Sequence, residues 1–178
     1  MSGGLEGLRR RLLRRLLLGL ARPRFPFCGA DIVVPVGVLN PTAFRASLGF
    51  ARAAIAAAPD GPSEVLELGC GVGLAAVLLA RAGHRVTATD IDPRAAIAAA
   101  ANARRSGVPL RALVCDWDAA LAPGERYDLV VVNPPFLIVT MPDLWDMFRH
   151  EFEGADYRVY MTDSIEQKDL DRDAEDLQ

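Results

Sequence analysis

A regular alternation of short apolar runs and helical segments between residues 42 and 132 constrains the fold of this chain most strongly. Short β-branched runs are typical of buried strands, whereas longer alanine- and leucine-rich segments are typical of helices. The predicted strands are Val65–Leu68, Arg85–Thr89, Leu110–Val114 and Tyr127–Val132, and the predicted helices are Thr42–Ala58, Leu74–Ala82 and Arg94–Ser106. Such alternation predicts an α/β fold with a doubly wound, mainly parallel sheet and helices on both faces.

The segments that flank this core have different compositions. Residues 5–21 repeat leucine at helical spacing among five arginines, which predicts a basic amphipathic helix. It could be a surface helix, or it could contact an RNA backbone or an anionic membrane surface. Prolines and glycines between residues 23 and 41 predict a loop with a short strand at Ile32–Val34.

The carboxyl-terminal part has a weaker pattern. A helix over Asp143–Glu153 and a strand over Tyr157–Thr162 are predicted, followed by a charged run. We therefore expect an amino-terminal helix and loop over residues 1–37, an α/β domain over 38–162 and an acidic tail over 163–178.

Composition excludes several classes of protein. The chain has 178 residues, of which 51% are hydrophobic, so most of it is expected to fold. No apolar run reaches the roughly 20 residues that cross a bilayer, which excludes an integral membrane protein. Three widely spaced cysteines and two histidines give neither a disulfide framework nor a structural zinc site, so a cytoplasmic location and no metal are expected.

Charge is distributed unevenly along the chain. Residues 1–140 carry 16 Arg and 11 Asp or Glu, a net charge of +5, whereas residues 141–178 carry a net charge of −8. The basic part could favour an anionic partner such as RNA, and the acidic part would repel one.

The first motif with chemical content is the sequence ELGCGVG, residues 67–73, between a predicted strand and a predicted helix. Glycines allow a sharp turn and let a ligand approach the backbone closely. A dinucleotide-binding turn needs a third glycine where Leu74 stands, which disfavours NAD. An acidic residue two positions before the first glycine suits a ligand with a cationic amino-acid end, although a glycine turn alone could be purely structural.

Two further motifs follow the next two predicted strands. Asp90, in the sequence TDIDP, can accept hydrogen bonds from both hydroxyls of a ribose, and Asp92 is a predicted helix cap with Pro93 at the first helical position. Asp116 and Trp117 combine a carboxylate, able to accept from an exocyclic amine, with an aromatic face. All of these motifs fall at the carboxyl ends of strands, where open α/β sheets bind ligands.

The fourth motif, Asn133-Pro134-Pro135-Phe136, follows the last strongly apolar strand. Two prolines stiffen the turn and remove backbone donors. The Asn133 amide and the Pro134 carbonyl could accept hydrogen bonds from a planar amino group while Phe136 stacks on it. Without the glycine motif this could be an ordinary rigid loop.

The order ELGCGVG, TDID, CDW and NPPF resembles the class I S-adenosylmethionine-dependent methyltransferases over about residues 38–136. More narrowly, it resembles amino-group N-methyltransferases with an N-P-P-[YF] turn, such as release-factor glutamine and small-domain rRNA guanine methyltransferases. The resemblance implies S-adenosyl-L-methionine as cofactor and Asn133, Pro134, Pro135 and Phe136 as the catalytic residues. The implied cofactor-binding residues are Thr42, Glu67, Gly69, Cys70, Gly71, Gly73, Asp90, Ile91, Asp116, Trp117 and Asn133.

The resemblance implies methyl transfer to an amide or exocyclic amino nitrogen, in protein glutamine or RNA guanine. A small-molecule amine substrate, or a truncated or inactive cofactor-binding module that acts through a partner, are the alternatives. Relatives have a seven-stranded sheet in the order 3-2-1-4-5-7-6, yet only 42 residues follow Phe136. The sheet is therefore expected to lack its last strands and to expose an edge, which self-association or a partner chain could cover.

Overall fold

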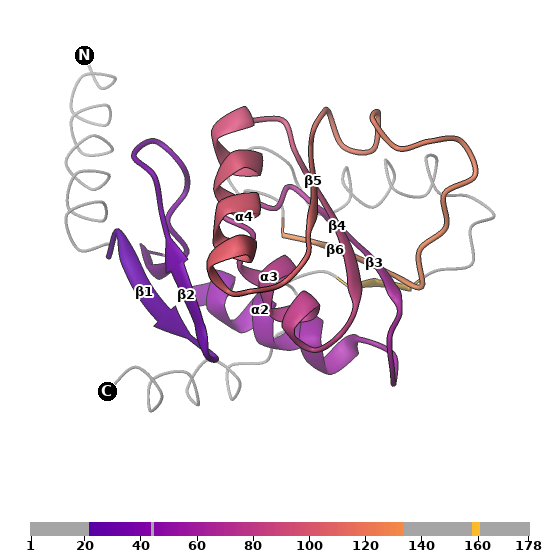
Figure 1. Ribbon diagram of the computed structural model, residues 1–178, viewed down its shortest axis with the longest axis horizontal. Helices are drawn as coiled ribbons and strands as arrows, with labels where there is room; N and C mark the ends of the chain where they lie inside the picture. Colours follow the sequence, from indigo (N-terminus) through magenta and orange to yellow (C-terminus); the bar gives the residue numbers. More distant parts are fainter. Residues whose placement is uncertain (1–21, 44, 134–157, 161–178) are drawn as a thin grey trace, which may run out of the picture.

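Five parallel strands form the central sheet of the computed structural model, which describes residues 22–43, 45–133 and 158–160 (Figure 1). Their order across the sheet is β5-β4-β3-β6-β7. The strands are β3 (Glu64–Leu68), β4 (Arg85–Asp90), β5 (Arg111–Val114), β6 (Leu129–Val132) and β7 (Arg158–Tyr160). The predicted parallel α/β sheet is confirmed, and the strand expected within Tyr157–Thr162 pairs in parallel with β6.

The sheet has a switch point between β3 and β6. The chain leaves β3 for β4 and then β5, and afterwards returns to the other side of β3 to form β6 and β7. Leu68, the last residue of β3, is in register with Thr89 of β4 and with Val132 of β6. The carboxyl ends of the three central strands therefore meet at one edge, and ligands of open α/β folds bind in the crevice at such a point.

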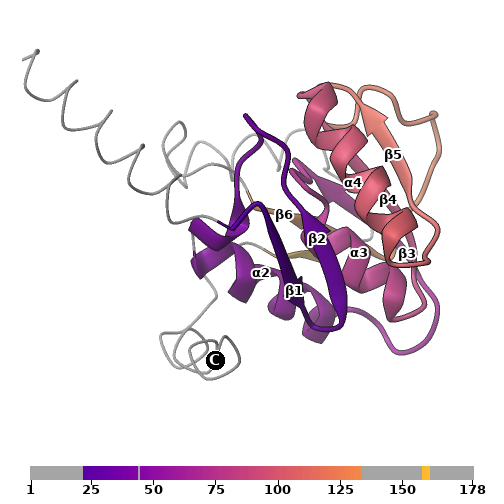
Figure 2. The same cartoon turned by 60° about the vertical axis from the view of Figure 1, so that its left-hand side comes forward.

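The α-helices of the described residues cover the sheet on one side (Figure 2). The helical segments are η1 (Pro41–Ala43), α2 (Arg45–Ala57), α3 (Leu74–Arg81) and α4 (Pro93–Arg105). Because β3-α3-β4 and β4-α4-β5 advance in the same direction, right-handed crossovers place α3 and α4 on the same face. The α3 helix contacts both α2 and α4. The helix predicted over Asp143–Glu153 lies outside the described residues.

Local sequence explains where these elements begin and how the core forms. The Asp92 side chain accepts a hydrogen bond from the Arg94 backbone N–H at 2.9 Å, and Pro93 occupies the first helical position, as predicted. All four residues of β6 are buried, as expected of an inner strand of a parallel sheet. The apolar run that predicted this strand is therefore also part of the core.

The prediction of a loop before residue 32 is wrong at Arg24–Phe27. These residues form β1, which pairs antiparallel with β2 (Ala30–Val33) around a tight turn. Exposed and buried residues alternate along β1, with Phe25 and Phe27 in the core, and Pro26 lies on the exposed side, where an edge strand tolerates it. Pro26 within the strand and Pro23 directly before it concealed the alternation. The turn residues Cys28 and Gly29 both have positive φ, 46° and 77°, as in common two-residue hairpins.

Asn102 of α4 anchors this hairpin. Its side chain accepts from the Val33 N–H at 2.9 Å and donates to the Val33 carbonyl at 3.0 Å and the Val72 carbonyl at 2.9 Å. One buried amide thus joins the hairpin, α4 and the glycine-rich turn.

Several predictions fall outside the described residues: the helix over residues 5–21, the Pro134–Phe136 turn and the acidic tail. Within the described residues, none of the helices combines the length and apolar character that spanning a bilayer requires.

Candidate functional site

The glycine-rich segment forms the turn from β3 into α3. Gly69, Gly71 and Gly73 all adopt left-handed backbone conformations, with φ of 68°, 53° and 73°. The Cys70 N–H donates to the Thr89 carbonyl of β4 at 2.9 Å, which ties the turn to the neighbouring strand. A positive φ is costly for residues other than glycine, so the sequence pattern is required by the backbone itself.

The three glycines face different surroundings. A Cβ built on Gly69 or on Gly71 would meet nothing within 4 Å, so both face open space. A Cβ on Gly73 would lie 2.6 Å from the Cβ of Ala99 in α4. Gly69 and Gly71 therefore leave room for a ligand, whereas Gly73 has an independent structural reason to lack a side chain.

Asp90 ends β4 and holds the glycine turn from one side. Its Oδ2 accepts from the Gly71 N–H at 2.8 Å, and its Oδ1 accepts from the Asp92 N–H at 2.9 Å. An ionised carboxylate has about four acceptor positions, so two remain for a ligand's donors. The next residue, Ile91, is 70% exposed, which places an apolar side chain beside this carboxylate.

Glu67 supports the same turn from its buried side. Its buried carboxylate accepts from the Ala76 N–H, in the first turn of α3, at 2.8 Å. Burial raises the pKa of Glu67 to about 8; the bond from Ala76 opposes this rise and the charge of Asp90 adds to it. A cation placed near Glu67 would favour the ionised form and would be held by it.

Cys70, between the glycines, is buried. Burial, and secondarily the charge of Glu67, raises the pKa of the Cys70 thiol above its ordinary value. The side chain is therefore a neutral packing group, and the ligand-facing part of the turn is its backbone.

The third motif lies after β5. The Cys115 N–H donates to the Asp90 carbonyl at 3.1 Å, so this segment continues alongside the end of β4. Asp116 is exposed, and Trp117 is half-buried with a left-handed φ of 44°. A left-handed tryptophan is rare, and such conformations occur where the surroundings fix a residue in place.

Asn133 and Thr42 complete the described part of the predicted site. Asn133 is half-buried and directly follows Val132, which is in register with Leu68 at the end of β3. Thr42 belongs to a separate cluster, where its Oγ1 donates to Asn40 Oδ1 at 2.7 Å and accepts from the Arg22 N–H at 3.1 Å. These contacts give Thr42 a local role in starting η1; a contact with the cofactor stays a prediction.

The structure thus brings the turn, Asp90 and Asn133 to one edge of the sheet. Sequence reasoning missed Asn102, which supports the turn through the Val72 carbonyl. The sequence signal for this role is an asparagine within an alanine-rich helix, because asparagine does not favour the interior of a helix.

Comparison with known proteins identifies the family. The family described as "Methyltransferase domain" matches residues 65–153, half of the chain. Release factor glutamine methyltransferase of Bordetella pertussis is 45% identical over 76 residues, which are 42% of this chain and 28% of that protein. The enzyme of the same name from Koribacter versatilis is 38% identical over 114 residues, 62% of this chain and 40% of that protein. The chain thus spans less than half the length of these relatives.

A solved structure has the same arrangement. The 16S rRNA methyltransferase RsmC of T. thermophilus, in complex with AdoMet and guanosine, matches with a TM-score of 0.53 and 25% identity. The match covers 66% of this chain and 33% of that one. With the family match over half its length and the glycine turn at the switch point of its sheet, the chain belongs to the methyltransferase domain family.

Proposed function

We propose that the chain binds S-adenosyl-L-methionine at the carboxyl edge of its sheet and methylates a planar amide or exocyclic amino nitrogen. The observation that carries this proposal is the hydrogen bond from the Gly71 N–H to Asp90, at 2.8 Å, at the edge of the sheet where β6 ends directly before Asn133. This contact joins the glycine-rich motif to the motif that contains Asp90. The register of β6 with β3 brings Asn133, at the start of the fourth motif, to the same edge of the sheet.

The residues present fit this cofactor. Gly69 and Gly71 face open space, so the backbone can be approached closely there. The buried Glu67 carboxylate suits the ammonium group of the methionine end, and the free acceptor positions of Asp90 suit two ribose hydroxyls. Asp116 and Trp117 would frame the adenine.

When bound, S-adenosyl-L-methionine would supply a methyl group on a positively charged sulfur, which leaves as a neutral thioether when the S–CH3 bond breaks. The protein then has to align the target nitrogen, and alignment can lower a barrier by about 7–11 kcal/mol. The lone pair of an amide or aniline-like nitrogen is delocalised, which makes it a weak nucleophile. Acceptors at Asn133 and Pro134 would polarise its N–H bonds and favour the pyramidal geometry of the transition state.

The names of the relatives support two classes of methyl acceptor and do not distinguish between them. Release factor glutamine methyltransferases favour a protein amide, and a 16S rRNA methyltransferase favours a guanine amine. A cytoplasmic location, and a second chain covering the exposed edge of the sheet, stay predictions.

Transfer of a tritiated methyl group tests the proposal. The full chain would be incubated with labelled S-adenosyl-L-methionine and, separately, with ribosomal RNA, with release factors and with a small amine. Label is expected in one acceptor and is expected to be lost with Asp90→Asn, which weakens the cofactor site. Cofactor binding without transfer to any acceptor would contradict the enzyme and favour a binding module.

A further inference from the structure

Asn102 of α4 is a buried amide whose hydrogen bonds all leave its own helix. The residue is only 1% exposed, and its side chain bonds both to Val33 of β2 and to the carbonyl of Val72 in the glycine-rich turn. Both N–H groups of the amide are therefore used. One side chain thus joins segments that lie 30 and 69 residues away from it in the sequence.

The bond to Val72 stands where a helical backbone bond could form. A bond from the Ala76 N–H to the Val72 carbonyl, four residues earlier, would extend α3 back into the turn. Instead, the Ala76 N–H donates to the buried Glu67 carboxylate at 2.8 Å. The Val72 carbonyl accepts from Asn102 Nδ2 at 2.9 Å. Two side chains therefore make α3 begin after Gly73, its N-cap, and keep the preceding turn out of the helix.

The same bond fixes the peptide group between Val72 and Gly73. On its other side, the Gly73 N–H donates to the Cys70 carbonyl at 2.8 Å, so the group is held at both ends. Without Asn102, the Val72 carbonyl would be a buried acceptor lacking this partner, or the peptide group would have to rotate. Rotation would change the backbone next to Gly71, where a ligand can approach closely. The shape of the ligand-facing turn therefore depends on a side chain in α4.

The other two bonds of Asn102 go to a single residue of the β1–β2 hairpin. The Val33 N–H donates to Asn102 Oδ1 at 2.9 Å, and the Val33 carbonyl accepts from Asn102 Nδ2 at 3.0 Å. The next residue, Val34, donates to the Pro23 carbonyl at 2.8 Å, so Val33 presents its groups on the edge of β2 that faces away from β1. The amide pairs with this edge as another strand would, and so connects the hairpin to the turn.

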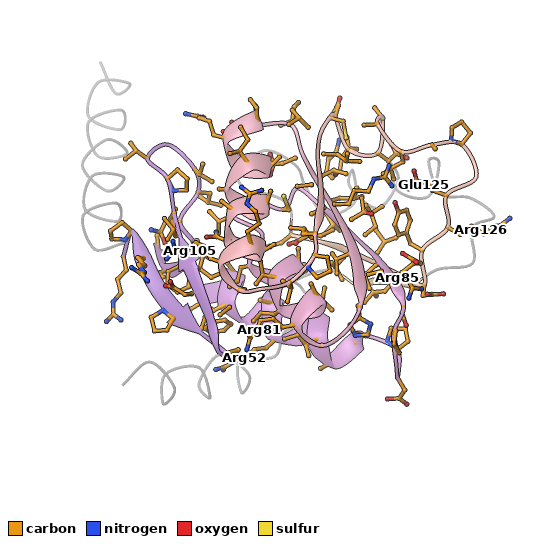
Figure 3. The ribbon with its side chains drawn as sticks, viewed as in Figure 1. Arg52, Arg81, Arg85, Arg105, Glu125 and Arg126 are labelled. Carbon is orange, nitrogen blue, oxygen red and sulfur yellow. The ribbon has the colours of Figure 1, made fainter. Side chains whose placement is uncertain are left out.

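A second contact between α4 and the hairpin lies near the surface. Arg105, three residues after Asn102 and therefore on the same face of the helix, binds Oδ2 of Asp31 at 2.7 Å. Figure 3 shows Arg105 on the hairpin side of α4. Its side chain is 40% exposed, and an exposed ion pair contributes little to stability. This pair attaches the hairpin to α4 but not to the glycine-rich turn, so Arg105 is a matched control for Asn102.

We propose that Asn102 is a positioning residue for cofactor binding, which holds the turn in the conformation where Gly69 and Gly71 face open space and makes this conformation depend on the hairpin. The inference rests on the proposed function, because it takes the turn to be the cofactor site. A ligand bound at the turn then stabilises the contact between Asn102 and Val33. By the reciprocity of linked equilibria, loss of that contact weakens the ligand by the same factor.

Calorimetric titration of the full chain with S-adenosyl-L-methionine tests the contact with the turn. Asn102→Asp keeps the shape of the side chain and the acceptor for the Val33 N–H, but it has no N–H group for the two carbonyls. We expect its Kd to rise at least about tenfold, because a buried carbonyl is left unpaired, and that of Asn102→Ala to rise at least as much. The control Arg105→Gln is expected to raise the Kd less than about threefold. Circular dichroism establishes a temperature at which all the proteins are folded.

Hydrogen exchange of the Val33 N–H, followed by NMR, measures the coupling itself. At a free cofactor concentration of about ten times the Kd, we expect this exchange to slow about tenfold in the unmodified chain. The slowing is expected to persist in Arg105→Gln and to disappear in Asn102→Ala. An Asn102 that served stability alone would not make a hairpin amide respond to a ligand at the turn.

Equal losses of affinity in Asn102→Asp and Arg105→Gln would overturn the inference, as would Val33 exchange that the cofactor leaves unchanged. The exchange measurement uses the unmodified chain, so it decides the question even if both variants at position 102 fail to fold. Absence of cofactor binding by the unmodified chain would contradict the proposed function and this inference with it. Cofactor binding without any response of Val33 would contradict this inference alone.

Discussion

Two carboxylates support the glycine-rich turn from different sides. Asp90 binds the Gly71 N–H from the half-exposed edge of the sheet, whereas Glu67 binds the Ala76 N–H from the buried interior. The two side chains are close enough for the charge of Asp90 to raise the pKa of Glu67. A cationic ligand group between them would relieve this repulsion, which is the electrostatic basis of the proposed cofactor site.

Asn133→Ala separates binding from chemistry. The substitution removes an amide acceptor at the end of β6 and leaves the turn and Asp90 unchanged. We expect the Kd for S-adenosyl-L-methionine to change less than about threefold, while kcat falls at least about 100-fold, the usual loss for an electrostatic group of the transition state. Calorimetry and methyl-transfer rates check this. Unchanged turnover would remove Asn133 from the catalytic residues.

Glu67→Gln tests the raised pKa of the buried carboxylate. With a folded pKa of about 8, above the ordinary value of 4.5, Glu67 contributes stability that is fully present below about pH 4.5 and is lost as pH rises toward 8. The amide still accepts from the Ala76 N–H but does not titrate. The free energy of unfolding of the unmodified chain, relative to the variant, is expected to fall by up to about 1 kcal/mol per pH unit between pH 5.5 and 7.5. Urea unfolding at several pH values measures this difference, and parallel pH curves for the two proteins would contradict it.

At the scale of elements, packing of α3 against α4 depends on a glycine at the helix start. Gly73 is the N-cap of α3, and its α-carbon approaches Ala99 so closely that no side chain fits. The close approach allows the Val72 carbonyl to reach Asn102. Helix packing and the ligand-facing turn are therefore parts of one structure.

Gly73→Ala should be much more destabilising than Gly107→Ala. Both glycines have left-handed φ, 73° and 69°, but a Cβ on Gly107 would meet nothing within 4 Å. Backbone strain costs about 1–2 kcal/mol at both positions, and overpacking adds about 1–3 kcal/mol at Gly73. Urea unfolding of the two variants gives the comparison. Equal destabilisation of the two variants would contradict the overpacking argument, because it would mean that α4 can move away from the start of α3 without a cost in free energy.

The same elements show what a sequence can predict. Strands β3, β4, β5 and β6 were predictable because each contains a short apolar or β-branched run, and glycine, aspartate or asparagine ends the strand or follows it within two residues. Strand β1 was not, because Pro26 masks a two-residue alternation that only contact with the helices makes visible. Local sequence predicted where each of these strands ends. It did not predict that Gly73 differs from Gly71, because that difference depends on Ala99, which lies 26 residues after Gly73 in the chain.

At the scale of the whole molecule, the order of strands brings the motifs together. Gly71, Asp90 and Asn133 are separated by up to 62 residues in the sequence, and only the return of the chain past β3 places them at one edge. The fold thus positions the candidate site.

The central claim is that this edge of the sheet binds S-adenosyl-L-methionine, and calorimetric titration of the full chain with that compound tests it most directly. We expect one site per chain, with binding weakened at least about tenfold by Asp90→Asn, because the carboxylate loses acceptor capacity for both the turn and the ribose. A titration that gives no binding heat at millimolar cofactor, with the chain folded, would contradict the claim.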